Sequence, residues 1–146
     1  MKKMLIVTPH LSTGGAPQFT LNKIELIKNE YNILCVEYDF VAPEFVVQRN
    51  KIKNILGDKF IPLGDNKLRL IEIIKDFKPD ILSMEEIPEF FMNDSITEAI
   101  YSPNRNYTIF ETTHDSSFPI EDKRWLPDKF IFVSAFNAFK YSVFDV

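Results

Sequence analysis

The fold is decided by residues 4–29 at the start of the chain, MLIVTPHLSTGGAPQFTLNKIELIKN. The run Met4–Thr8 is apolar up to its last residue, which predicts a strand buried on both faces. The segment Pro17–Asn29 predicts a helix, and Pro17 suits its first turn. The apolar side chains of this segment recur at helical spacings, at Phe19, Leu21, Ile24 and Ile27. A strand, a glycine-containing loop and a helix in this order indicate the first unit of an α/β fold.

The same alternation continues along the chain. Further strands are predicted at Ile33–Tyr38, Phe60–Leu63, Ile81–Met84, Tyr107–Thr112 and Lys129–Ser134. Further helices are predicted at Pro43–Leu56, Asp65–Phe77 (with Asp65 or Asn66 as N-cap), Pro88–Ile100 and Phe136–Phe144. Right-handed crossovers connect strands of this kind into a parallel sheet. We therefore predict one α/β domain over residues 1–146, with a Rossmann-like, doubly wound, mainly parallel sheet of about six strands flanked by helices.

The composition excludes several classes of protein. With 14 Phe, five Tyr and one Trp among 146 residues, the chain has ample apolar area for a folded core. A net charge of −4 and scattered lysines argue against a nucleic-acid partner. The single cysteine, Cys35, cannot form an internal disulfide and is expected to be buried and inert. Because the chain has only one cysteine and two histidines, we expect no metal site. No apolar run approaches the ~20 residues of a membrane-spanning helix, and we expect a cytoplasmic protein.

The loops after the first and fourth strands are the first candidates for a ligand site. Ligands of an open parallel sheet bind beyond the carboxyl ends of its strands, where the strand order reverses, and in the common order this point lies between those two strands. After the first strand, Gly14 and Gly15 stand directly before a helix, where backbone N–H groups and the helix dipole can bind a phosphate. The loop matches neither G-x-G-x-x-G nor a Walker A pattern. The alternative interpretation is an ordinary tight turn.

Polar residues also follow the fourth and fifth strands. Glu85 and Glu86 follow the fourth strand directly, where carboxylates can accept hydrogen bonds from sugar hydroxyls or act as a general base. The alternative is an acidic cluster that the dipole of the next helix favours. His114 follows the fifth strand, and the neighbouring carboxylate of Asp115 can orient its ring for a functional role. The alternative is a histidine that is only a polar surface residue or a hydrogen-bonded core residue. His10 follows the first strand, so both histidines are predicted to lie at the same edge of the sheet.

Four segments in order resemble the N-terminal half of GT-B glycosyltransferases: HLSTGGAPQ (10–18), KPDIL (78–82), YTIFETTHDSS (107–117) and KFIFVS (129–134). The resemblance is to the large retaining family that includes many bacterial surface-polysaccharide and lipid-glycan enzymes, and it covers nearly the whole chain. It implies transfer of a sugar from a nucleotide sugar to a glycan, lipid or other acceptor. The nucleotide-diphosphate sugar would be a substrate, with no tightly bound cofactor and no metal.

The resemblance also assigns roles to residues at matching positions. Gly14 and Gly15 would bind the donor diphosphate, Glu86 and His114 would be catalytic, and the acceptor would be bound by His10, Glu85 and Asp115.

The second domain of the family, with its E-x(7)-E motif and most of the donor site, has no counterpart in these residues. We therefore expect this chain alone to be inactive and to need that domain in trans or by continuation of the chain. Self-association through the exposed cleft is also possible for such a half. The alternative function is a non-catalytic Rossmann-like module that binds a nucleotide or a protein.

Overall fold

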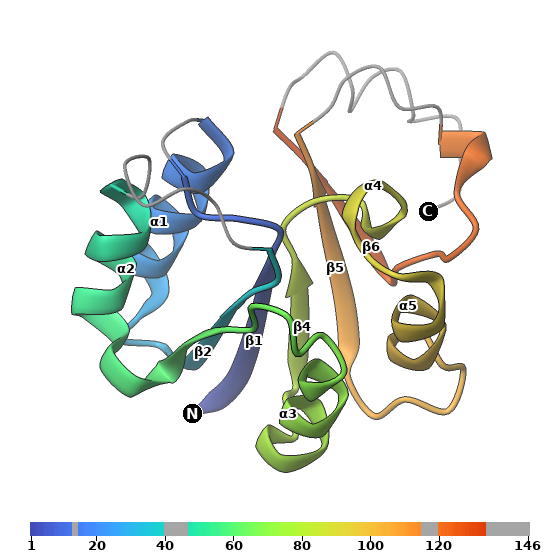
Figure 1. Ribbon diagram of the computed structural model, residues 1–146, viewed down its shortest axis with the longest axis horizontal. Coiled ribbons are helices and arrows are strands. Elements are labelled where there is room, and N and C mark those ends of the chain that lie inside the picture. The colour runs from blue at the N-terminus through green and yellow to red at the C-terminus, as the bar shows by residue number, and fades with distance from the viewer. Residues whose placement is uncertain (13–14, 40–46, 115–119, 134–146) are drawn as a thin grey trace.

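The computed structural model describes residues 1–12, 15–39, 47–114 and 120–133. Within these ranges one all-parallel sheet has the strand order β3-β2-β1-β4-β5-β6 (Figure 1). Its strands are β1 (Lys2–Thr8), β2 (Tyr31–Glu37), β3 (Phe60–Pro62), β4 (Ile81–Met84), β5 (Thr108–Thr113) and β6 (Lys129–Phe132). The predicted Rossmann-like, doubly wound fold is confirmed, and the strand order reverses between β1 and β4.

Helices cover both faces of the sheet. They are α1 (Gly15–Ile27), α2 (Val47–Leu56), α3 (Arg69–Phe77), α4 (Pro88–Phe91) and α5 (Asp94–Ile100), with the short 3-10 helices η2 (Gly57–Lys59) and η3 (Ile120–Asp122). Helices α1 and α2 pack on one face, and α3, α4 and α5 lie on the other (Figure 1). The predicted helix start at Pro43 and the predicted helix Phe136–Phe144 lie outside the described residues.

Each face of the sheet has its own apolar core. The core under α1 and α2 includes Ile6, Leu21, Ile24, Cys35 and Ile52. The core under α3, α4 and α5 includes Leu5, Val7, Leu70, Leu82, Ile96 and Ile109. Side chains of β1 thus enter both cores in alternation, and residues 5–7 have no exposed surface. A central strand covered on both faces explains why this run is apolar throughout. Cys35 is a buried free thiol, as predicted.

The predicted helix Pro88–Ile100 is interrupted in the structure. Met92 has an extended backbone, with φ −104° and ψ 146°, which ends α4, and the N-cap of α5, Asn93, is also extended. The interruption places Met92 in the same core cluster as Ile96. The Asn93 N–H donates to Tyr38 Oη at 3.3 Å. Tertiary contacts therefore override the helical periodicity of this segment.

Helix α3 begins at Arg69, and neither Asp65 nor Asn66 caps it, so this part of the prediction was wrong. Instead, the Asn66 N–H donates to the carbonyl oxygen of Leu63 at 3.1 Å and closes a turn. Gly64 lies within this turn at φ +59°, a left-handed conformation that glycine adopts without strain. The polar residues that were expected to cap the helix belong to this turn.

A buried carboxylate at the end of β2 anchors the loop that follows β1. The Leu11 N–H donates to Glu37 Oε2 at 2.8 Å, and Glu37 is 1% exposed. The guanidinium of Arg49 donates to Glu37 Oε1 through Nε, at 2.9 Å, and through Nη2. The Arg49 N–H also donates to the carbonyl oxygen of Leu11 at 3.2 Å. One ion pair thus joins the β1 loop to β2 and α2.

Substitution of this arginine tests the anchor. Arg49→Met keeps the apolar stem but leaves the Glu37 carboxylate buried without its cation, so we expect the free energy of unfolding to fall by about 3 kcal/mol. Urea unfolding measures this change. The matched control is Arg69→Met, at an exposed position of α3, for which we expect a change within about 0.5 kcal/mol. Equal effects of the two substitutions would contradict the anchoring role.

Candidate functional site

The candidate site lies at the carboxyl ends of β4 and β5, on the sheet face that α1 covers. Ile6 belongs to the core under α1, and the parallel register pairs it with Ser83 of β4. Side chains alternate along a strand, so Glu85 lies on the same face as Ser83. The same register and alternation place Thr112 and His114 on this face at the end of β5. Residues from two neighbouring strands therefore meet beside the point where the strand order reverses.

Lys23 of α1 joins this group. Its Nζ lies 2.6 Å from Glu85 Oε1 and donates to Ser83 Oγ at 2.5 Å. Ser83 Oγ in turn donates to Glu85 Oε1 at 2.9 Å. The Glu85 side chain is 1% exposed and that of Lys23 is 17% exposed. The ion pair therefore fastens α1 to the end of β4, with the carboxylate buried and the lysine side chain largely covered.

His114 is held against α1, in surroundings that favour its neutral form. Its imidazole meets the ring of Phe19 edge to face, with 5.2 Å between centroids. Burial is the main cause that lowers the pKa of His114 from its ordinary 6.5; the Glu85 carboxylate opposes this shift and the Lys23 ammonium adds to it. Because Phe19 and Lys23 are four residues apart, one face of α1 carries both groups that approach the histidine.

Three buried polar atoms of this site have no hydrogen-bond partner among the residues that the structure describes: Glu85 Oε2, Thr112 Oγ1 and His114 Nε2. Buried polar groups in folded proteins are almost always hydrogen-bonded. These atoms therefore need a hydrogen-bond partner, such as water or a hydroxyl group of a ligand. A carboxylate accepts, a hydroxyl both donates and accepts, and a neutral imidazole nitrogen does either according to its tautomer. This set suits a hydroxyl-bearing group.

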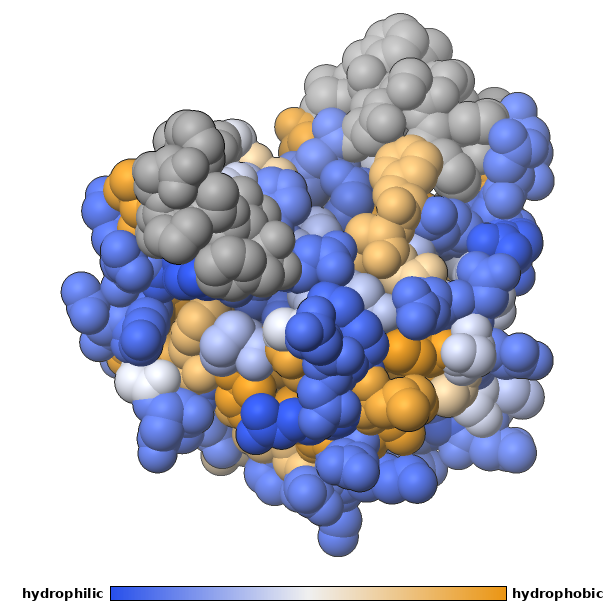
Figure 2. Space-filling model, viewed as in Figure 1, coloured by the Kyte–Doolittle hydropathy of each residue, from blue (hydrophilic) through white to orange (hydrophobic). Residues whose placement is uncertain are grey.

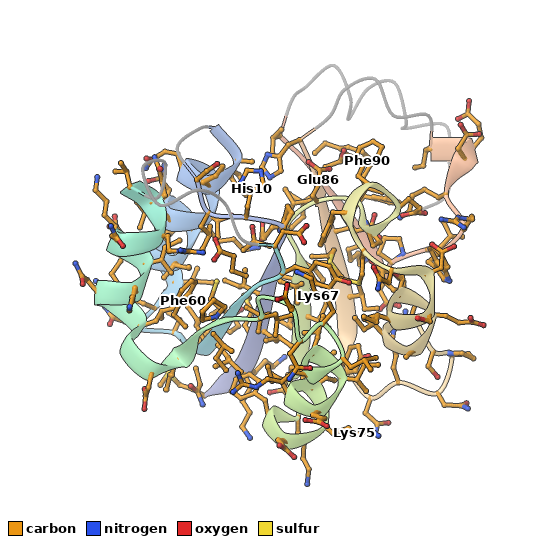
Figure 3. All side chains as sticks on the ribbon, in the orientation of Figure 1. His10, Phe60, Lys67, Lys75, Glu86 and Phe90 are labelled. Atoms are coloured by element: carbon orange, nitrogen blue, oxygen red, sulfur yellow. The ribbon has the colours of Figure 1, made fainter. Side chains whose placement is uncertain are left out.

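Of the other predicted site residues, His10 and Glu86 lie at the same end of the sheet as this group (Figure 3). His10 follows β1 and is exposed, and its Nδ1 lies 2.9 Å from Ser12 Oγ. Glu86 is half-buried and accepts the Ile87 N–H at 2.9 Å. Glu85, expected to face a ligand, uses one oxygen for Lys23 and Ser83. Gly14 and Asp115 lie outside the described residues.

Gly15 opens α1 at an exposed position. A Cβ atom built on it meets no other atom within 4 Å, and its φ is not in the left-handed range. The fold itself therefore does not require glycine at this position. The first turn of α1 carries no acidic residue, so its dipole is not offset by a local carboxylate. Space and charge at this helix start are both compatible with an approaching anion.

A second buried ionic cluster lies on the opposite face of the sheet, and sequence reasoning missed it. Lys123 Nζ lies 2.6 Å from Glu89 Oε1 and 2.8 Å from Glu111 Oε1, and Tyr101 Oη donates to Glu111 Oε2 at 2.6 Å. Burial raises the pKa of Glu111 to about 7; Lys123 and the Tyr101 hydrogen bond oppose this shift, and Glu89 adds to it. The cluster attaches the segment after η3 to β5, α4 and α5.

The raised pKa of Glu111 makes stability depend on pH. Its pKa is about 7 in the folded chain against an ordinary 4.5, so the protonated carboxyl stabilises the fold below about pH 4.5, and this contribution is lost as pH rises through about 7. Glu111→Gln keeps an uncharged acceptor for Tyr101 and removes that loss. We expect its free energy of unfolding, relative to the parent chain, to rise by about 2 kcal/mol between about pH 5 and pH 8.

Urea unfolding of both proteins at the two pH values measures this difference. The exposed Glu121 of η3 supplies the control, since Glu121→Gln should retain the pH dependence of the parent. If Glu111→Gln retains it as well, the carboxyl of Glu111 does not titrate as described.

No protein-family model matches this chain, and no curated protein sequence matches it. Over the described ranges, no helix is long and apolar enough to cross a membrane. The same residues contain no group of three or more His, Cys, Asp or Glu side chains that could hold a metal ion. The fold and the polar residues at the ends of β4 and β5 are therefore the features of this chain that bear on its function.

Proposed function

We propose that this chain is the acceptor-binding half of a glycosyltransferase that moves a sugar from a nucleotide sugar to a hydroxyl of a glycan, lipid or other acceptor. The observation that carries the proposal is the group of unpartnered polar atoms on Glu85, Thr112 and His114. They lie where an open parallel sheet binds its ligands, and hydroxyl groups satisfy all three. Resemblance to the GT-B family points to the same chemistry.

In this proposal, hydroxyl groups of the acceptor are the hydrogen-bond partners of the unpartnered atoms on Glu85, Thr112 and His114. Neutral His114 and the free oxygen of Glu85 accept hydrogen bonds from them, and Thr112 fixes their orientation. Glu86, half-buried at the same strand end, and His114 are the candidates for taking the proton of the attacking hydroxyl. His10 follows β1, on the other side of the point where the strand order reverses, and contacts the acceptor from that side.

In the same proposal, the donor diphosphate binds at the start of α1. Backbone N–H groups at Gly15 can approach a phosphate closely, and the positive end of the helix dipole stabilises charge that develops on the leaving diphosphate. A second domain holds the rest of the donor, so the transferase consists of this half and a donor-binding half. We place the activity in the cytoplasm and in the assembly of surface polysaccharides or related glycans.

Sugar transfer in the presence of a donor-binding domain tests the proposal. That domain is supplied as a donor-binding polypeptide of on the order of 150–200 residues with an E-x(7)-E motif. Thr112→Val keeps the side-chain shape and removes the hydroxyl, so we expect the acceptor KM to rise about tenfold while the donor KM is unchanged. Gly15→Val should instead raise the donor KM.

Thr108→Val is the matched control, because Thr108 is at the exposed amino end of the same strand, and it should leave both constants unchanged. If Thr112→Val and the parent have the same acceptor KM, the Thr112 hydroxyl does not take part in acceptor binding, and this would contradict the proposed acceptor site. A chain that binds nucleotide or protein but gives no transfer with any donor-binding domain would support the non-catalytic module instead.

A further inference from the structure

A groove of about 620 Å³ lies between α3 and α5, at the amino ends of β4 and β5. It is thus at the opposite end of the sheet from the candidate site. Its lining is mainly apolar and includes Ile71, Ile74, Pro79, Ile100 and Tyr107. Figure 2 shows apolar surface in the lower part of the view, where Figure 1 places α3 and α5. The volume lies within the range of sites that bind small molecules, roughly 300–1,000 Å³.

Two unpaired ammonium groups lie on the rim of this groove. Lys75 and Lys78 line it from the end of α3 (Lys75 is labelled in Figure 3), and neither side chain has a hydrogen bond or an ion pair within the described residues. The other charged lining residues have partners. Arg105 pairs with Asp128 at 3.0 Å, and Asp80 Oδ2 accepts the Lys3 N–H at 2.8 Å. The groove therefore combines an apolar floor with free positive charge.

The backbone of Lys78 adopts a left-handed conformation that is unfavourable for a residue with a side chain. Its φ is 53°, and it is the only non-glycine residue with positive φ in the described part of the chain. It occupies the C-cap of α3, where its N–H donates to the carbonyl oxygen of Ile74 at 3.0 Å. Glycine or asparagine is the usual residue in a left-handed cap. A lysine here puts a cation where glycine would leave none.

We propose that this groove binds a single-chain anionic amphiphile, with its apolar chain on the floor and its carboxylate or phosphate head on Lys75 and Lys78. A small polar anion would leave the floor uncovered, and a neutral apolar ligand would leave both ammonium groups unpaired. Only a ligand with both parts complements both features. The inference is independent of the proposed transferase activity, because none of its residues belongs to the candidate site.

Titration of the full chain with three probes tests this inference. Decanoate has the chain and the charge, decanol has the chain alone, and acetate has the charge alone. Backbone amide NMR signals of Ala99, Ile100 and Tyr107 report on the groove. We expect decanoate, below its micelle concentration, to shift these signals in a saturable manner, decanol to bind at least about fivefold more weakly, and acetate to have no effect.

Variants locate the head group. The double variant Lys75→Gln with Lys78→Asn removes both charges, and asparagine tolerates the left-handed backbone. We expect its decanoate affinity to fall about fivefold. The matched control, Lys51→Gln with Lys53→Gln, removes two exposed charges from α2 and should keep the affinity of the parent.

The inference is overturned if decanoate does not bind, if decanol binds equally well, or if both double variants lose affinity equally. It is likewise overturned if only anionic vesicles or an acidic amphipathic peptide, and not monomeric decanoate, shift the groove signals.

Discussion

The parallel pairing of β1 with β2 on one edge and with β4 on the other is the constraint on which the rest of the structure depends. A strand paired on both edges and covered on both faces must be apolar, and residues 5–7 are completely buried. From this strand the chain winds outward in two directions, with α1 and α2 on one face and α3, α4 and α5 on the other. The loops after β1 and β4 therefore diverge, and polar residues can gather where they separate.

Three strands have a buried carboxylate in them or directly after them, and each carboxylate is paired with a cation from another segment. The pairs are Glu37 of β2 with Arg49, Glu85 after β4 with Lys23, and Glu111 in β5 with Lys123. Taking an ion out of water costs several kcal/mol unless a partner compensates it. Each pair thus commits a helix or loop to one strand end. The ion pair that fastens α1 to β4 leaves the second oxygen of Glu85 buried and without a hydrogen-bond partner among the described residues.

The two ends of the sheet differ in chemistry for a structural reason. At the carboxyl ends, the buried ion pairs bring polar atoms close together but satisfy only part of their hydrogen-bonding capacity. At the amino ends, α3 and α5 leave an apolar groove with lysines at the C-terminus of α3, where the helix dipole favours positive charge. The site proposed for hydroxyl recognition and the groove proposed for an anionic amphiphile therefore lie at separate places, and a substitution at one end need not disturb the other.

By itself, the sequence determined the fold class, the positions of the strands and the edge at which His10, Glu85, Glu86 and His114 gather, because apolar runs and helical periodicity are local and the crossover rule orders the strands. Only the tertiary structure decided what these residues contact. Lys23 lies 62 positions from Glu85 in the sequence, and periodicity shows which face of α1 is buried but not which long side chain reaches a strand end. The interruption at Met92, the partners of Glu37 and Glu111, and the groove between α3 and α5 likewise depend on how distant segments pack, because packing and desolvation act between elements rather than along the chain.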